Sequence, residues 1–332
     1  MAYTDIDDPE AYFQVKIYTG TGSSQAQTFD GDTDMQPDMV WIKQRSGVEQ
    51  HVIFDSVRGV QKYITPNTTA AEGDTATTLT AFGSDGFTEG GHGITGGSSS
   101  TYASWNWKEQ AGVMDIVTYT GNGSNRTIAH NLGVKPAVMV HKGRSNTYNW
   151  GVYHHALSPS NERSLNFNTT GAVNVDDGGV YYNSTDPTSS VFSLGTNVGY
   201  NANNATYVAY LFAEKQGYSK FSSFVGNGNA DGTFVYTGFK PAWVMWKRTD
   251  ATNDWYIYDN KRNSFNTMGR RLEANQSDDE VNSGSAIVDF LSNGYKFRGT
   301  DSSWNVSGGN FIYMAFAEAP FVTSSGVPAT AR

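Results

Sequence analysis

The chain repeats one pattern about every 105 residues, and this period constrains its fold more than any other feature. Each copy opens with an aromatic residue that leads into a Gly-x-Gly turn. A proline follows 15 to 17 residues after the first glycine, and an apolar run then ends in a lysine six residues after the proline. The landmarks are the turns Gly20–Gly22, Gly121–Gly123 and Gly226–Gly228, the prolines Pro37, Pro136 and Pro241, the lysines Lys43, Lys142 and Lys247, and a basic partner at Arg45, Arg144 and Arg248.

The copies also end alike, on a strand-like aromatic segment followed by a glutamate. These glutamates, Glu109, Glu214 and Glu318, lie 105 and 104 residues apart. The links between copies are too short for free swinging, so we expect a compact or rod-like stack. The predicted units are a first repeat at 1–110, a second at 111–216, a third at 217–320 and an extended C-terminal tail at 321–332.

The local patterns are those of strands. Aromatic residues make up 14% of the chain, charged residues only 17%, and there are 36 glycines, which suits short strands joined by tight turns. Asp85-Gly86 and Asn293-Gly294 each lie between aromatic residues and predict two hairpins. We interpret the Gly-x-Gly segments as hairpin turns too, and expect a short helix only at 260–274. The prediction is an all-β chain of three tandem β-sandwich or jelly-roll-like domains, each with its own core.

Charge and composition narrow the function. The chain has 23 Lys+Arg against 32 Asp+Glu, a net charge of -9, which disfavours binding to the phosphates of a nucleic acid. It has no cysteine, so disulfides and thiolate chemistry are excluded. The first ten residues lack the apolar core of a signal peptide, and no apolar stretch approaches the roughly 20 residues of a membrane helix. We therefore expect synthesis in a cytoplasm and no membrane insertion.

Three tryptophans are the candidate ligand-binding residues. Trp150 and Trp255 occupy matching positions in the second and third copies, and Trp304 lies in a predicted loop. An exposed indole face can stack on the apolar C–H edges of a sugar, so these residues are candidates for glycan contact. The alternative is that they are buried anchors, as aromatic residues usually are.

Other residue clusters predict no metal, cofactor or catalytic site. The run Asp30-Gly-Asp-Thr-Asp34 resembles half a calcium loop but lacks its glycine and its final glutamate. Asp55 and Arg58, like Asp259 and Arg262, are an acid and a base three residues apart. Such a pair can clamp a ligand, but we favour a structural ion pair that holds a turn, and the second copy lacks both charges. No serine–histidine pair or carboxylate pair recurs between copies, so the sequence offers no anchor for catalysis. The second copy holds four histidines that would need to converge to bind a metal: His130, His141, His154 and His155.

Several motifs resemble an uncharacterised tandem-repeat family of virion structural proteins from tailed, largely marine, bacteriophages. The resemblance covers nearly the whole chain and is carried by Tyr119-Thr-Gly-Asn-Gly123, Lys240-Pro-Ala-Trp-Val-Met-Trp-Lys-Arg248, Asp289-Phe-Leu-Ser-Asn-Gly-Tyr-Lys296, Tyr313-Met-Ala-Phe-Ala-Glu318 and the ending Ser325-Gly-Val-Pro-Ala-Thr-Ala-Arg332. It implies a protein of the phage particle, made in the host cytoplasm and located in the tail or on the head. It implies no active site.

The resulting prediction is a non-enzymatic protein of the virion surface, a tail fibre or a tail-associated or head-attached subunit, that adheres to host surface glycans. The alternative is a purely architectural capsid decoration or adaptor that binds only other virion proteins. A polysaccharide depolymerase is the third hypothesis, and it would need two carboxylates in one cleft. The expected partners are other virion proteins, further copies of the chain and a host glycan.

Overall fold

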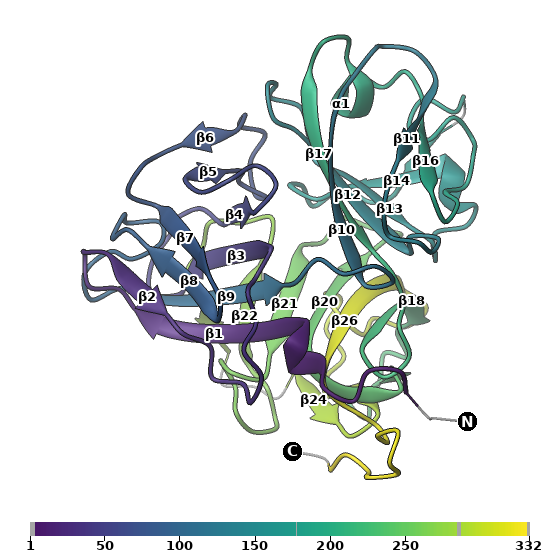
Figure 1. Ribbon diagram of the computed structural model, residues 1–332. Helices are drawn as coiled ribbons and strands as arrows, with labels where there is room; N and C mark the ends of the chain where they lie inside the picture. Colours follow the sequence, from purple (N-terminus) through teal and green to yellow (C-terminus); the bar gives the residue numbers. More distant parts are fainter. Residues whose placement is uncertain (1–3, 177, 284–286, 331–332) are drawn as a thin grey trace.

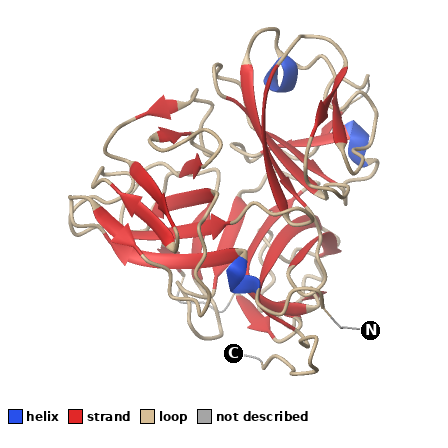
Figure 2. Ribbon diagram, in the orientation of Figure 1, coloured by secondary structure: helices blue, strands red, loops and turns tan. Residues whose placement is uncertain are grey.

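The computed structural model describes residues 4–176, 178–283 and 287–330. The chain is all-β, as predicted, and the described residues contain only one short α-helix and two 3-10 turns beside the strands (Figure 2). The sheets gather in three groups around a common centre, coloured purple to blue, teal, and green to yellow in Figure 1. Each group lies within one predicted repeat, and we call these segment 1 (1–110), segment 2 (111–216) and segment 3 (217–320).

Segment 1 is a sandwich of a larger and a smaller sheet. The larger sheet has the order β1-β9-β3-β4, the smaller one β2-β8-β7, and β5 and β6 form a separate pair. The elements are η1 (Pro9–Ala11), β1 (Phe13–Thr19), β2 (Gln25–Gln27), β3 (Met39–Gln44), β4 (Val52–Asp55), β5 (Lys62–Tyr63), β6 (Gly73–Asp74), β7 (Leu79–Gly83), β8 (Gly86–Glu89) and β9 (Thr101–Trp107).

Segment 2 keeps the same plan. Its larger sheet runs β10-β17-β12-β13-β14-β15, and β11 pairs with β16. The elements are β10 (Met114–Thr120), β11 (Arg126–Ala129), β12 (Val138–Gly143), β13 (Gly151–His154), η2 (Ser160–Glu162), β14 (Arg163–Asn166), β15 (Asn174–Val175), β16 (Val191–Leu194), α1 (Val198–Asn201) and β17 (Thr206–Phe212).

Segment 3 repeats this order with longer central strands. Its larger sheet is β18-β26-β20-β21-β22-β23, and its smaller sheet is β19-β25-β24. The elements are β18 (Ser219–Val225), β19 (Phe234–Tyr236), β20 (Phe239–Arg248), β21 (Trp255–Asp259), β22 (Arg270–Glu273), β23 (Val281–Asn282), β24 (Val288–Leu291), β25 (Gly294–Phe297) and β26 (Asn310–Pro320).

The two hairpins predicted from Asp-Gly and Asn-Gly are confirmed. Strands β7 and β8 close at Gly83↔Gly86, and β24 and β25 close at Leu291↔Gly294. The helix expected at 260–274 is wrong, because its second half is β22, which pairs with β21 on one side and β23 on the other. Strand pairing therefore decides the conformation of this segment, in preference to its weak local helix propensity.

The Gly-x-Gly segments are not hairpin turns. The strand before each one belongs to the larger sheet and the strand after it to the smaller sheet, so the segment is a crossover between layers. A Cβ on Gly20, Gly121 or Gly226 would lie within 2.4 Å of backbone atoms of the facing loop. The second glycine of each motif, for example Gly22 with φ +73°, has a left-handed backbone that glycine adopts without strain. Close backbone approach therefore explains the motif.

The three segments do not have fully separate cores. Each has an outer cluster between its two sheets, but the largest cluster takes side chains from all three larger sheets. Its centre contains Trp107, Phe212 and Phe316, whose ring centroids lie 5.6–6.2 Å apart. They come from β9, β17 and β26, which in each segment are the last strand along the chain. Alternate residues of the proline-led strands face this centre and the outer cluster, which explains why those runs are apolar throughout.

Three loops close the segments into a ring. We call residues 64–72, 167–173 and 274–280 the crossing loops, because each reaches from its own segment to the larger sheet of another. The backbone N–H of Glu72 donates to Arg144 O at 2.8 Å, that of Val173 to Thr249 O at 3.0 Å, and that of Glu280 to Arg45 O at 2.8 Å. These contacts run from segment 1 to 2, from 2 to 3 and from 3 back to 1, and we call the junctions seams 1/2, 2/3 and 3/1.

The two links and the tail are tightly held. The links turn through β-bridges at Gln110↔Met114 and Lys215↔Ser219. Through residue 330 the tail is not a free extended arm, since it turns back at a Val322↔Pro328 bridge. The backbone N–H of Ser324 donates to Asp7 Oδ1 at 2.6 Å, so the tail lies against the N-terminal segment. Residues 331–332 lie outside the described residues.

Candidate functional site

Trp150 and Trp255 lie in the seams and are buried. The indole N–H of Trp150 donates to Thr65 O at 3.0 Å, and that of Trp255 donates to Asn166 O at 3.2 Å, in each case on the preceding segment. In segment 1 the matching position is His51, whose Nε2 lies 3.1 Å from Glu273 O. These residues join the segments and offer no ring face to a sugar.

The His51 ring has a defined tautomer. The indole N–H of Trp41 can only donate, and it lies 3.0 Å from His51 Nδ1, so Nδ1 accepts and Nε2 carries the hydrogen that Glu273 O receives. Burial, together with the charge of Lys43, holds the pKa of His51 well below its usual value. The ring is therefore neutral and replaces the indole N–H of the other two seams.

Trp304 is buried in segment 3, where its ring meets Tyr256 edge-on with centroids 6.1 Å apart. The three tryptophans singled out by sequence are therefore not brought together, and none presents an exposed face. Glycan contact through Trp150, Trp255 and Trp304 has no geometric support, because packing occupies the faces that a sugar would need.

Seam 1/2 is closed by a buried network of charges. Arg58 Nε lies 2.5 Å from Asp55 Oδ2, and its Nη1 lies 3.1 Å from Glu72 Oε2. Arg144 of segment 2 binds Glu72 through two N–H groups, at 2.8 and 3.0 Å. Burial alone would raise the pKa of Glu72, but the hydrogen bond from Arg144 and the charge of Arg58 lower it. Tyr210 of segment 2 completes the network by donating to Asp55 Oδ2 at 2.6 Å.

Seam 3/1 has the same network. Arg262 pairs with Asp259 at 2.5 Å, and Glu280 is bound by Arg45 of segment 1 at 2.9 and 3.0 Å. Arg270 adds a further bond to Glu280 at 2.9 Å. Burial alone would raise the pKa of Glu280, but the hydrogen bond from Arg45 and the charge of Arg262 lower it to about 2. The predicted Asp–Arg pairs are therefore structural, and each is part of a seam.

Seam 2/3 has the same backbone contact but different side chains. In seam 2/3, His154 takes the position of Asp55 and Leu157 that of Arg58. Val173 takes the position of Glu72 and Thr249 that of Arg144. The predicted basic partner Arg248 is not equivalent to Arg45 and Arg144, because the crossing loop bonds to Thr249, one residue later. Instead of a charge network, seam 2/3 has an open groove of about 410 Å³, lined by Ala156, Leu157, Ser158, Arg163, Val173, Ser223, Thr249, Asp250, Asn310, Phe311 and Ile312.

The four histidines of segment 2 do not converge. His154 Nε2 bonds to Tyr313 O at 3.1 Å across seam 2/3, and His141 lies in an aromatic cluster, where burial lowers its pKa to about 3. His130 bonds to Thr188 O and His155 to Phe221 O. Within the described ranges, no group of three or more His, Asp or Glu side chains is placed to hold a metal ion.

One carboxylate pair was not found from the sequence. The Glu109 side chain shares a hydrogen bond with Asp115, and Glu109 Oε1 also accepts from Ile116 N at 3.2 Å. Burial, followed by that hydrogen bond to Asp115, raises the pKa of Glu109 to about 7. Two carboxyl groups in direct contact leave no space for the sugar and water of a glycosidase, which need a separation of about 5 Å or more. The pair lies at the link between segments 1 and 2.

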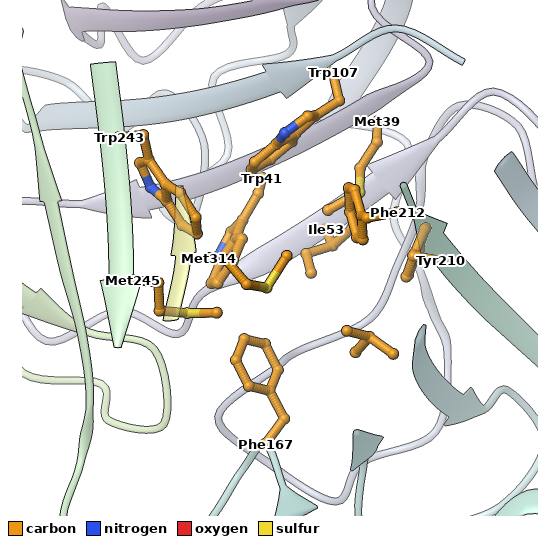
Figure 3. A pocket seen from close by; sticks show the side chains of 11 residues that line it. Met39, Trp41, Ile53, Trp107, Phe167, Tyr210, Phe212, Trp243, Met245 and Met314 are labelled. Carbon is orange, nitrogen blue, oxygen red and sulfur yellow. The ribbon is translucent and has the colours of Figure 1, made fainter. Parts of the chain in front are cut away.

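The centre of the ring is a small apolar void of about 30 Å³ (Figure 3). Side chains from all three segments point into it, among them Trp41, Phe212 and Met245, as the sticks in Figure 3 show. A space of this size has room for water, but an apolar lining gives water no hydrogen-bond partner. The void is far smaller than a typical ligand pocket of about 300 Å³ or more, so ligand-sized space lies at the surface grooves.

The fold and the seams define a class of all-β protein in which three matching sheets interlock around one core. A family model described as "Domain of unknown function (DUF7483)" matches residues 8–320, nearly the whole chain. The protein belongs to this family, whose single model spans all three segments. A search of curated proteins and a search of solved structures gave no match. No helix in the part of the chain that the structure describes is long and apolar enough to cross a membrane.

Proposed function

We propose that the chain is a non-enzymatic structural protein of a tailed-phage particle, exposed at the virion surface and adhesive toward host glycans. The observation that carries the proposal is the ring itself. Its three sheets are joined by crossing loops in sequence, so the surface grooves are held by a rigid frame, as a receptor-binding surface requires. The resemblance of the repeated motifs to virion proteins supports the particle as its location, in the tail or on the head.

The chemistry of the described residues supports a binding role over a catalytic one. The Glu109–Asp115 pair is too close for glycoside hydrolysis. The buried Asp–Arg pairs are neutralised by their partners and hold the seams. Release of reducing ends from host capsule by the purified protein would support the depolymerase hypothesis instead.

A second candidate function, an architectural subunit that binds only virion proteins or further copies of the chain, is favoured by the edge strand β19. Phe234 and Tyr236 on this strand are 43% and 54% exposed, and Val225 nearby is 55% exposed. The matching edge strands β2 and β11 carry small side chains at these positions, such as Ala26 and Thr127. An edge strand with exposed aromatic residues is typical of a surface that another protein covers.

The experiment for location is mass spectrometry and immunogold labelling of purified virions. We expect the chain in stoichiometric amounts and labelling on the outer surface. Its absence from washed particles would contradict the virion proposal. Binding of the purified chain to a glycan array separates the adhesive from the architectural function, because only the adhesive function predicts saturable glycan binding.

A further inference from the structure

The groove at seam 2/3 exists because three charged side chains of the other seams are missing there. In seam 1/2 the space is filled by Arg58, Glu72 and Arg144, and in seam 3/1 by the equivalent Arg262, Glu280 and Arg45. Leu157, Val173 and Thr249 replace them in seam 2/3, and a groove of about 410 Å³ remains. This volume lies within the usual range for small-ligand pockets.

Arg163 is the cation that this replacement leaves without its carboxylate. The equivalent residue in segment 3, Arg270, binds Glu280 at 2.9 Å. The position of Glu280 is taken by Val173 in seam 2/3, and among the described residues no carboxylate lies within 4.0 Å of Arg163. Its Nε donates to Ser158 O at 3.3 Å, and the residue lines the groove. An arginine fork in this setting fits a ligand carboxylate.

The remaining walls of the groove add acceptors, hydroxyls and apolar surface. Asp250 accepts from Arg248 Nε at 2.6 Å and from Asn310 N at 3.3 Å. Burial alone would raise the pKa of Asp250, but the hydrogen bond from Arg248 lowers it, so the side chain is an ionised acceptor. Hydroxyl-bearing residues and apolar residues complete the lining: Ser158, Ser223 and Thr249, and Leu157, Val173 and Ile312.

We propose that this groove binds a carboxylate-bearing sugar unit, a hexuronic acid of a host surface polysaccharide. The sugar carboxylate would bind Arg163, in place of the missing glutamate. Sugar hydroxyls would donate to Asp250, and the C–H face would contact the apolar wall. This inference rests on the adhesive function proposed above and names its ligand class. Because the net charge of the chain is -9, affinity has to come from groove contacts and not from long-range attraction.

The test is calorimetric titration of the full chain with trigalacturonic acid, with neutral galactotriose as the matched control ligand. We expect saturable binding of the acidic trisaccharide and at least tenfold weaker binding of the neutral one. No binding of trigalacturonic acid at millimolar concentrations, or equal binding of both sugars, would overturn the proposal.

Three variants locate the binding in the groove. Arg163→Gln removes the cation and should weaken binding at least tenfold. The double variant Val173→Glu, Thr249→Arg restores two of the three missing charges, supplies Arg163 with a carboxylate and should abolish binding. Lys62→Gln, at the position equivalent to Arg163 in segment 1, is the control and should leave binding unchanged. Circular dichroism checks that each variant is folded. If the double variant does not fold, the binding measured for Arg163→Gln tests the groove assignment by itself.

The outcome also separates this inference from the function on which it rests. If the chain binds host cells, and both Arg163→Gln and the double variant bind them equally well, the groove assignment is wrong and the adhesive function stands. If the chain binds neither host cells nor any array glycan, the adhesive function fails as well. Binding of an acidic peptide in preference to trigalacturonic acid would overturn the sugar assignment.

Discussion

Seams 1/2 and 2/3 join the same surfaces with the same backbone contact, yet one is closed and the other is open. In both, the crossing loop donates a backbone N–H to the next sheet, at 2.8 and 3.0 Å. Beside this backbone contact, seam 1/2 contains a network of four charged side chains, whereas seam 2/3 contains an open groove. The comparison teaches that the ring depends on backbone pairing and the shared apolar core, which leaves the side chains of one seam free for another task.

Breaking the closed seam should have the largest effect. Arg58→Leu, which copies the residue of seam 2/3, leaves Asp55 buried without its cation. We expect a loss of about 3–5 kcal/mol in the free energy of unfolding, because an uncompensated buried charge is costly. Urea unfolding followed by tryptophan fluorescence measures it. The equivalent change Arg262→Leu in seam 3/1 should give a similar loss, and a loss below about 1 kcal/mol in both would contradict the account.

Acid should weaken seam 3/1 through the carboxylate of Glu280. The pKa of Glu280 is about 2 in the folded chain against an ordinary value of 4.5. Its contribution is therefore fully present above pH 4.5 and is lost as the pH falls through 2. Each tenfold change in acidity corresponds to about 1.4 kcal/mol, so the contribution is about 3 kcal/mol.

The measurement is unfolding free energy against pH for the wild type and for Glu280→Gln. The variant should be less stable at neutral pH, and the two curves should converge as the pH falls from 4.5 toward 2. Curves that stay parallel over this range would show that the charge of Glu280 does not hold seam 3/1.

The links between segments 1 and 2 and between segments 2 and 3 differ in the surroundings of their glutamates, and this difference should have a smaller effect on stability. The pKa of Glu109 is raised to about 7, so its ionisation costs stability as the pH rises from 4.5 through 7. Glu109→Gln should therefore be more stable than the wild type above pH 7, by about 1–2 kcal/mol after allowance for its partial exposure. Glu214, at the matching position, pairs with Lys220 at 2.9 Å, so Glu214→Gln should bring no gain. Thermal melts of both variants across this pH range test the contrast.

Closing the open seam should have the smallest effect on stability. The double variant Val173→Glu, Thr249→Arg adds an ion pair at a partly exposed site, where such pairs contribute about 1 kcal/mol or less. A small rise in melting temperature is expected, with loss of uronate binding as the accompanying change. A drop of several kcal/mol would mean that seam 2/3 does not accept the geometry of the other two.

The sequence predicted the all-β class and two hairpins because these depend on local patterns. Asp85-Gly86 and Asn293-Gly294 specify their turns through a few adjacent residues. The shared core could not be predicted, because Trp107 and Phe316 show the same apolar pattern whether they face their own segment or another. The Gly-x-Gly motif was misread for a similar reason, since close backbone approach and a hairpin turn both favour glycine.

The seams could be predicted only in part. The Asp55–Arg58 and Asp259–Arg262 pairs were predicted as structural, but their partners Glu72 and Glu280 lie in loops without regular pattern. A signal was present in Asn67, Asn168 and Asn275, which follow the equivalent positions His51, Trp150 and Trp255 by 16, 18 and 20 residues. Each accepts a hydrogen bond from the backbone N–H of the His51, Trp150 or Trp255 position and so fixes the start of a crossing loop. The groove itself results from Leu157, Val173 and Thr249, which replace charged residues of the other seams. This correspondence is visible only when the three seams are compared in the structure.

Calorimetric unfolding of the full chain tests the central claim, that three segments interlock as one body around a shared core. We predict a single transition in which the van't Hoff enthalpy equals the calorimetric enthalpy. Three separable transitions, or a van't Hoff enthalpy near one third of the calorimetric value, would show that the segments unfold independently and would contradict the account.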